Sequence, residues 1–236
     1  MHQVKFDPST LRALTSRTVI ITGGAGGIGA ATAKVFNEHG ANVVIADIPI
    51  FEEKANKIID SLPYPSKALF VPVDILDWEQ MTTLFKRTIQ IFGALHVVIA
   101  NAGIMESAEV LDLDDVDGDG NLRESEEAFK VIDVNLKGTL NTSTSGYFGG
   151  TGVSAYVSSK HGMIGLLRGS QKAARKYGVS VKAIAPFFTP TRITAGFADK
   201  WKEAGLEGNT PEMVGTAIAQ SAMSHTESGS CILESS

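Results

Sequence analysis

The sequence predicts one α/β domain, a doubly wound parallel sheet between two layers of helices (three-layer α/β/α). Short, continuous apolar segments alternate along the chain with longer segments of helical character. This alternation is typical of a parallel sheet that is covered on both faces. The length of 236 residues suits one large core, so we expect a single domain over residues 1–236.

The expected elements are assigned from these segments in chain order. Strands are expected at 18–22, 42–46, 68–73, 95–100 and 179–185, with a last short one at 231–233. Helices are expected from about 29 to 39 and at 51–62, 78–92, 125–142, 154–177 and 211–223. An acidic insertion at 112–127 follows the fourth strand.

Composition and charge exclude several classes of function. The formal net charge of −5 disfavours nucleic acid as a partner, because phosphate binding needs a basic surface. No apolar run is long enough to span a membrane. Cys231 is the single cysteine, which leaves no disulfide framework and no cysteine metal site. The polar first 17 residues hold no signal-peptide core, so a cytoplasmic location is expected.

A glycine-rich turn follows the first strand. Residues 22–29 read TGGAGGIG between a strand and a helix, where a phosphate-binding turn must lie. Gly23 allows a tight turn, Gly27 leaves room for a pyrophosphate, and Gly29 lets the helix pack closely. The helix start offers free N–H groups to the phosphates. The turn predicts a Rossmann-type dinucleotide site, and a P-loop is excluded because no Gly-Lys-Ser/Thr follows.

Asp47 ends the second strand, where a carboxylate can accept hydrogen bonds from the adenosine ribose hydroxyls. Its charge would repel the 2′-phosphate of NADP, so NAD is the expected cofactor. The alternative is a strand-end acid that only caps the next helix.

Tyr156 and Lys160 are four residues apart in an expected helix and therefore share a face. A nearby ammonium favours tyrosinate, so the pair can bring the phenol pKa toward working pH. That arrangement supplies a general acid/base for a carbonyl or an alcohol. The alternative is a surface pair without a role.

These motifs together resemble the short-chain dehydrogenase/reductase family, over about residues 16–234. Four motifs occur in the family's order: T-G-x-x-x-G-x-G at 22–29, N-A-G at 101–103, V-N-L-K-G at 134–138 and Y-x-x-x-K at 156–160. Ser143 stands thirteen residues before Tyr156, as the family's catalytic serine does.

The resemblance implies roles for particular residues. Tyr156 would be the acid/base, while Lys160 would lower its pKa and hold the nicotinamide ribose. Ser143 would hydrogen-bond the substrate oxygen, and Asn135 would hold a water linked to Lys160. The expected cofactor-binding residues are Gly23, Ala25, Gly27, Ile28, Gly29, Asp47, Ile48, Asp74, Ile75, Asn101, Ala102, Gly103, Tyr156, Lys160, Pro186, Phe188, Thr189 and Thr191.

The implied reaction is hydride transfer between NAD(H) and a hydrophobic secondary alcohol or ketone. Asp47 and the A-P-F-F-T sequence are most similar to the NAD-dependent secondary-alcohol dehydrogenases, a group that includes the hydroxyprostaglandin dehydrogenases. Phe187 stands where the family usually has glycine, so Phe187 and Phe188 would shape an apolar substrate pocket. The segment 193–208 either adds Phe197, Trp201 and Leu206 to that pocket or simply packs them in the core. The family is usually dimeric or tetrameric, which implies a homo-oligomer.

The acidic insertion matches the ligand spacing of an EF-hand calcium loop. Asp115, Asp117, Asp119, Gly120 and Glu126 occupy the corresponding positions. We expect an exposed loop without metal, because no helix is expected before Asp115; calcium binding is the alternative.

The chain departs from the family between Asn135 and Ser143. Only seven residues separate them, too few for a helix end and the central strand that should follow. We therefore expect a missing segment between Thr142 and Ser143, with the strands around Val98 and Ala183 left unpaired. A true deletion would favour a rival function, a non-catalytic NAD-binding or regulatory protein.

Overall fold

A computed structural model describes residues 8–110, 112–138, 153–203, 205, 207–224 and 228–234. Ser143 and the expected gap at 142–143 lie outside these residues. The strands are β1 (Thr18–Thr22), β2 (Asn42–Asp47), β3 (Ala68–Pro72), β4 (Val97–Ala100), β5 (Ala183–Pro186) and β6 (Cys231–Glu234).

The strands form two parallel sheets with the orders β3-β2-β1-β4 and β5-β6. In the larger sheet β1 lies between β2 and β4, and Ile20 is in register with both Val44 and Val98. The chain order reverses direction at β1 and β4, which makes their carboxyl ends a topological switch point. Ligands of open α/β sheets bind in the crevice at such a point.

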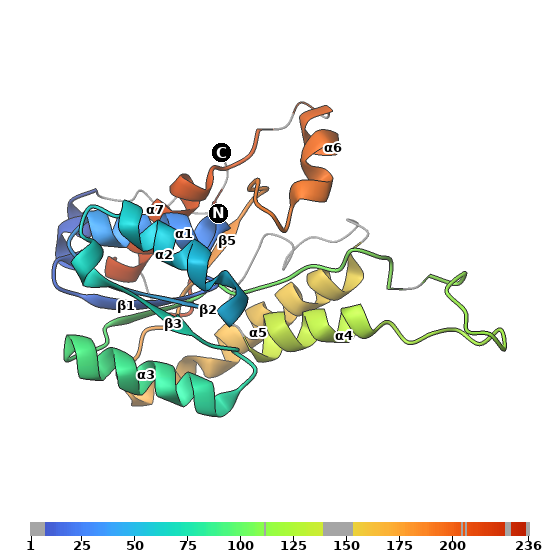
Figure 1. Cartoon of the computed structure of the whole chain (residues 1–236), viewed down its shortest axis with the longest axis horizontal. Helices are drawn as coiled ribbons and strands as arrows, with labels where there is room; N and C mark the ends of the chain where they lie inside the picture. The colour runs from blue at the N-terminus through green and yellow to red at the C-terminus, as the bar shows by residue number, and fades with distance from the viewer. Residues whose placement is uncertain are drawn as a thin grey trace.

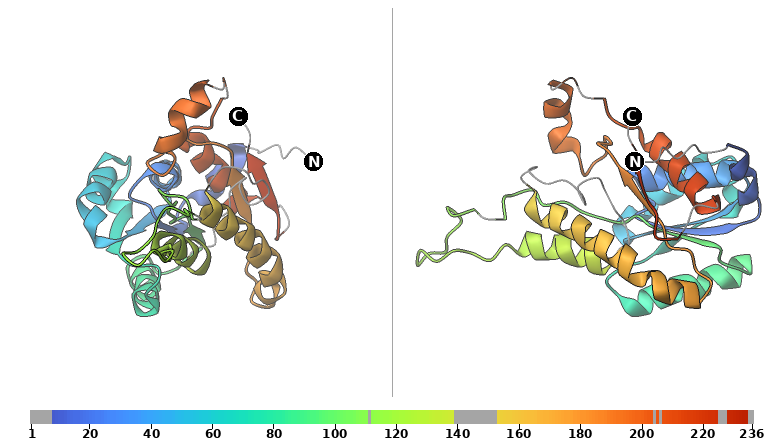
Figure 2. Two further views of the ribbon diagram at one scale, coloured as in Figure 1. Left: turned by 90° about the vertical axis from the view of Figure 1, so that its right-hand side faces the viewer. Right: turned by 180° about the vertical axis from the view of Figure 1, so that it is seen from behind.

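Helices cover both faces of the sheet, as Figure 1 shows. One layer contains α1 (Gly27–Glu38), α2 (Glu52–Ser61) and α7 (Pro211–Met223). The opposite layer contains α3 (Trp78–Phe92), α4 (Glu126–Ile132) and α5 (Ser154–Lys176). The short helix α6 (Ala198–Glu203) stands apart from both layers (Figures 1 and 2). The expected three-layer, doubly wound fold is confirmed.

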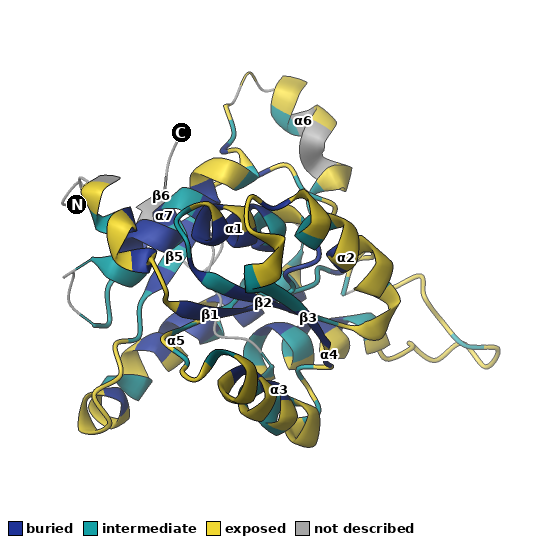
Figure 3. Ribbon diagram, turned by 60° about the vertical axis from the view of Figure 1, so that its left-hand side comes forward, coloured by how far each residue is buried: buried dark blue, intermediate teal, exposed yellow. Residues whose placement is uncertain are grey.

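The core lies where α1 and α7 meet the central strands, seen as dark blue ribbon in Figure 3. β1 is buried along its whole length because its apolar run meets helices on both faces. Phe36 of α1 and Leu14 are completely buried in this cluster. Leu14 belongs to the 3-10 helix η1 (Pro8–Leu14), which packs against α7. The sequence reading placed no element there.

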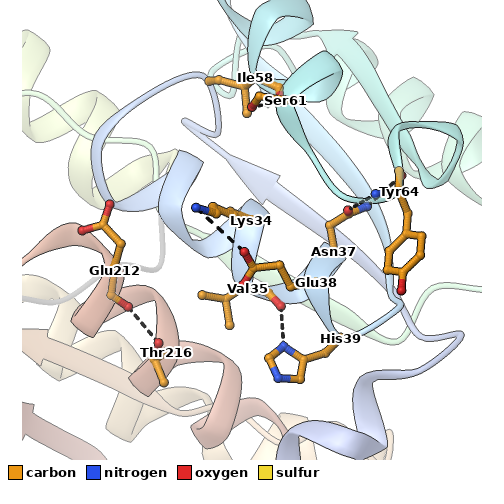
Figure 4. Close-up of polar contacts among 10 residues, drawn as sticks. All are labelled: Lys34, Val35, Asn37, Glu38, His39, Ile58, Ser61, Tyr64, Glu212 and Thr216. Carbon is orange, nitrogen blue, oxygen red and sulfur yellow. Dashed lines mark hydrogen bonds and ion pairs between the residues drawn. The ribbon is translucent and has the colours of Figure 1, made fainter.

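A buried asparagine fixes the carboxyl end of α1 (Figure 4). The Asn37 side chain donates to the Tyr64 carbonyl at 3.0 Å and accepts from the Tyr64 N–H at 2.9 Å. Its polar atoms are therefore satisfied although the residue is inaccessible to water. The two Asn37 bonds join α1 to the segment that leads into β3. Nearby, His39 Nδ1 forms a hydrogen bond with the Val35 carbonyl at 2.8 Å.

The two largest differences from the expected elements concern a helix and a strand, and the strand expected at 95–100 also begins later, at Val97. The helix expected at 125–142 is α-helical only to Ile132 and continues as a π-helix, η4 (Asp133–Lys137), in the described part of the chain. The strand expected at 179–185 begins only at Ala183. The residues before it are held by side chains instead: Val181 N–H donates to Ser228 Oγ at 3.0 Å, and Lys182 Nζ donates to the Ser221 and Ser224 carbonyls.

β4 and β5 belong to different sheets and do not pair with each other. Val98, in the middle of β4, is 43% exposed, which is unusual for a strand of a covered parallel sheet. Val98 and Ala183 both line one large cavity. The described strands therefore do not show β4 and β5 paired directly, as they would be if the sheet had closed over a deletion. The missing segment itself stays a prediction.

Candidate active site

A cavity of about 1550 Å³ opens at the carboxyl ends of the strands. It is larger than a typical small-ligand pocket, because it runs from the glycine turn past α5 and continues between β4 and β5. The described site residues that line it are Gly23, Ala25, Gly27, Ile28, Asp47, Ile48, Asp74, Ile75, Asn101, Ala102, Gly103, Tyr156, Lys160, Pro186, Phe188, Thr189 and Thr191. Gly29 and Asn135 are not part of its lining: Gly29 packs against the Gly23 carbonyl, and Asn135 bonds Ile104.

The glycine turn joins β1 to α1 at one end of the cavity. Gly23 and Gly27 have φ angles of 64° and 52°, a region that side chains rarely adopt. A Cβ on Gly29 would overlap the Gly23 carbonyl oxygen. Asn101 Nδ2 donates to the Thr22 carbonyl at 3.1 Å and so ties the turn to the end of β4. A side chain at Gly23 or Gly29 would clash with the end of β4 or with the turn itself, so glycine is required for this close packing.

Asp47 is bonded to the glycine turn. Its carboxylate accepts from the Ala25 N–H at 3.0 Å and from the Ile48 N–H at 2.9 Å. The 3-10 helix η2 (Pro49–Phe51) and α2 both begin without a side-chain cap, so Asp47 is not the helix cap of the alternative interpretation. Lys54 of α2, which the sequence reading did not single out, places its ammonium 2.7 Å from where a Gly26 Cβ would be.

Tyr156 and Lys160 lie in the first two turns of α5 and face the same cavity. The Lys160 ammonium is 5.1 Å from the centre of the Tyr156 ring. Lys160 is only 3% exposed, and this burial lowers its pKa from 10.5 to about 8. A buried ammonium beside a phenol is an arrangement that can favour the deprotonated phenol.

Asn135 lies on the π-helical turn η4 and is completely buried. Its side chain accepts from the Ile104 N–H at 2.8 Å and donates to the Ile104 carbonyl at 2.7 Å and to Ser159 Oγ at 3.2 Å. It therefore joins the segment after β4 to α5. A bound water between Asn135 and Lys160 stays a prediction.

Glu106 is a buried carboxylate that the sequence reading missed. It accepts hydrogen bonds from the backbone N–H groups of Ala155 and Tyr156 at the start of α5. Nothing in the sequence near Glu106 signals this contact, because its partners are 49 and 50 residues away.

Aromatic rings form the wall of the cavity nearest α6. The Trp201 ring stacks on Phe188 with centroids 4.5 Å apart and meets Phe187 edge-on at 5.1 Å. All three residues line the cavity, so the aromatic pairs hold α6 against the end of β5. The Phe197 side chain and Leu206 lie outside the described part of the structure.

The acidic insertion projects from the body of the molecule beyond α4 and α5 (Figures 1 and 2). It closes on itself through an antiparallel bridge between Val116 and Leu122. Asp117 accepts from the N–H groups of Asp119 and Asn121, both at 2.9 Å. Within the described residues, no group of three acidic, histidine or cysteine side chains is arranged to hold a metal ion. The expected absence of calcium stays a prediction.

The sheet order and the glycine turn define a class of protein: a Rossmann-type domain with a dinucleotide-binding turn at the switch point of its sheet. The family model described as short chain dehydrogenase matches residues 17–147 and 141–202. Short-chain dehydrogenase reductase 5 of Arabidopsis thaliana is 36% identical over 194 residues, 77% of this chain and 74% of the relative. (+)-cis,cis-Nepetalactol synthase NEPS3 of Nepeta racemosa is 33% identical over 195 residues, 77% and 71% of the two chains.

Solved structures agree on the fold. A short-chain type dehydrogenase/reductase from Mycobacterium marinum superposes with a TM-score of 0.78 at 20% identity, over 95% of this chain and 96% of that one. This chain belongs to the short-chain dehydrogenase/reductase family, whose members are NAD(P)-dependent oxidoreductases. No helix in the described ranges has the length and apolar character of a membrane span.

Proposed function

We propose that this protein transfers a hydride between NAD(H) and a hydrophobic secondary alcohol or ketone. The observation that carries the proposal is the Tyr156–Lys160 pair on α5, which faces the same cavity as the glycine turn. An acid/base and a dinucleotide cradle that share one cavity are the parts that hydride transfer with a proton requires.

The residues of the turn fit a bound dinucleotide, because Gly23 and Gly27 adopt positive φ angles and Gly29 lets α1 begin directly against the turn, as a pyrophosphate-binding turn requires. When bound, that group would supply the nicotinamide chemistry of hydride transfer. Phe188, Thr189 and Thr191 line the cavity beyond β5 and would hold the nicotinamide half. Asp74, Ile75 and Asn101 to Gly103 would flank the adenosine half.

Tyr156 moves the proton at the substrate oxygen: its phenol gives a proton to a ketone or takes one from an alcohol. Lys160 favours the tyrosinate through its charge and would hold the nicotinamide ribose. Ser143, in the segment outside the described residues, would hydrogen-bond the same substrate oxygen, and Asn135 would hold the water that links Lys160 to solvent.

NAD is proposed over NADP because the Asp47 carboxylate lies at the edge of the cavity, fixed to the turn by Ala25 N–H. It would repel a 2′-phosphate. The Lys54 ammonium, which lies beside Gly26, would instead attract a 2′-phosphate and so favour NADP. Titrations with NADH and NADPH, followed by cofactor fluorescence, should give at least about tenfold tighter binding of NADH. Equal affinities would contradict the role of Asp47, and Asp47→Ala should narrow the difference.

A hydrophobic substrate is proposed because Phe187, Phe188 and Trp201 line the cavity and because apolar and aromatic side chains are the usual lining of ligand pockets. The test is a screen of hydrophobic secondary alcohols with NAD and of the matching ketones with NADH. Tyr156→Phe should abolish nearly all turnover but leave NADH binding close to that of the wild type, because only the proton-transferring oxygen is removed. Retained turnover in Tyr156→Phe would show that another group moves the proton.

A homodimer or homotetramer is proposed from the faces of α4 and α5, which pack on each other. The family resemblance implies a contact between subunits on these helices, and Phe129 on α4 and Leu166 on α5, which are 59% and 41% exposed, would supply apolar contacts there. Light scattering after size-exclusion chromatography measures the assembly. Phe129→Glu should shift it toward the monomer.

One observation favours a second candidate function, a non-catalytic NAD-binding or regulatory protein. β4 and β5 lie in separate sheets, so the centre of the site is less well supported than in a closed sheet. NADH binding without turnover of any alcohol or ketone in the screen would favour this function.

A further inference from the structure

The amino end of α5 begins without a cap of its own. Its first residues carry N–H groups that have no partner within the helix, and such groups are usually satisfied by a side chain at the N-cap. The N-cap residue here is Val153, which makes no side-chain hydrogen bond. The acceptor must therefore come from elsewhere in the molecule.

Glu106 supplies that acceptor from the segment that follows β4. One carboxylate oxygen lies 2.7 Å from Ala155 N, and the other lies 3.0 Å from Tyr156 N. Glu106 is only 5% exposed, and a buried charge is costly unless it is hydrogen-bonded. The start of a 23-residue helix provides two N–H donors and the positive end of the helix dipole.

The same segment also contacts the other polar residues of the site. A Cβ on Gly103 would lie 3.2 Å from Asn135 Oδ1 and 3.9 Å from Lys160 Nζ, and Asn135 binds both backbone groups of Ile104. Residues 103–106 thus pass close to the Lys160 ammonium and link Asn135 of η4 to the first turn of α5.

We propose that Glu106 is a positioning residue for catalysis: by holding the backbone of Tyr156, it sets the place of the phenol relative to Lys160. This inference rests on the proposed function, in which Tyr156 is the acid/base. Glu106 itself touches neither substrate nor cofactor in this role. It acts through the Tyr156 N–H.

A neighbouring carboxylate provides a matched control. Glu127 of α4 accepts from the Ser107 and Ala108 N–H groups at 3.0 and 3.3 Å. It holds the same loop one residue further along, and within the described part of the chain its hydrogen bonds run to that loop and not to α5. If activity only required a well-ordered loop, loss of either carboxylate would lower it. If Tyr156 must be positioned, only loss of Glu106 lowers it.

The experiment compares Glu106→Ala and Glu106→Gln with Glu127→Ala and the wild type. Glu106→Ala should lower kcat roughly ten- to a hundredfold, because small displacements of a reacting group have effects of this size, while the Kd for NADH stays within about twofold of the wild type. Glu106→Gln should recover most of the lost kcat, since its amide oxygen still accepts from α5. Glu127→Ala should stay close to the wild type. Equal kcat values for Glu106→Ala and Glu127→Ala would overturn the proposal.

A second readout needs no turnover. The phenol of Tyr156 is titrated by ultraviolet absorbance in the cofactor-free protein, with Tyr156→Phe in each background as the reference. Both Glu106 variants lack the carboxylate charge and differ in the hydrogen bond, so their difference isolates position. The phenol pKa should be higher in Glu106→Ala than in Glu106→Gln, because the phenol is no longer held near the Lys160 ammonium.

The two readouts separate failure of this inference from failure of the proposed function. A wild type without turnover contradicts the proposed oxidoreductase, and the phenol titration then decides the role of Glu106 alone. Identical phenol pKa values in Glu106→Ala and Glu106→Gln would overturn the inference even in an active enzyme.

Discussion

Replacing the Lys160 ammonium with an apolar group should stabilise the folded protein while removing its activity. Lys160→Met keeps the length of the side chain but removes its charge. Lys160 as a residue is only 3% exposed, and burial lowers the pKa of its ammonium from 10.5 to about 8. Each pH unit between these values corresponds to about 1.4 kcal/mol, so holding the charged group in the core costs the fold about 3 kcal/mol at pH 7.

The pH dependence gives the sign of the effect. The folded state has the lower pKa, so between pH 8 and 10.5 the unfolded chain binds more protons and wild-type stability rises with pH. Lys160→Met lacks this rise. The variant should therefore be more stable than the wild type below pH 8, and the difference should disappear as the pH approaches 10.5.

Urea unfolding of the two cofactor-free proteins at pH 7, 9 and 10.5 measures the difference directly. Lys172→Met is the matched control, because Lys172 is on the same helix but exposed; it should change stability by less than about 0.5 kcal/mol. A Lys160→Met protein that is less stable than the wild type at pH 7, or a difference that does not vary with pH, would refute the reasoning.

Three further outcomes are expected. Gly29→Ala should weaken NADH binding at least about tenfold, because its Cβ would overlap the Gly23 carbonyl oxygen; unchanged fluorescence titrations would contradict the close packing of turn and helix. Asp77→Ala should lower the free energy of unfolding measured with urea, since Asp77 caps α3 by accepting from two N–H groups at 2.9 and 3.0 Å; an unchanged urea midpoint would contradict the cap. Calcium at roughly millimolar concentration should leave the thermal midpoint unchanged, whereas a rise that is lost in Asp117→Asn would identify the acidic insertion as a calcium site.

The local elements could be predicted where sequence and packing agree. α3 and α7 have the predicted bounds, 78–92 and 211–223, because Asp77 and Thr210 are strong caps before amphipathic or buried runs. The helix expected at 125–142 differs because η4 is π-helical around Asn135. Its side chain bonds a backbone 31 residues away, which helical periodicity does not report.

The residues of the candidate site also fall into two groups, those that the sequence predicts and those that only the structure shows. The glycine turn, Asp47 and the Tyr156–Lys160 spacing were readable because each motif is local and its backbone geometry follows from a few neighbouring residues. Glu106 and Lys54 could not be predicted, because each contacts a segment that is distant in the sequence.

The sequence by itself thus determined the α/β class, the glycine-rich turn and the placement of Tyr156 and Lys160 on one face of a helix, since alternation, glycine spacing and helical spacing are properties of short segments. Only the tertiary structure decided which carboxylate meets the start of α5, how deeply Lys160 is buried and that β4 and β5 lie in separate sheets. Burial and long-range hydrogen bonds depend on how distant segments pack. They set the position and the pKa of a side chain, and no local sequence pattern encodes them.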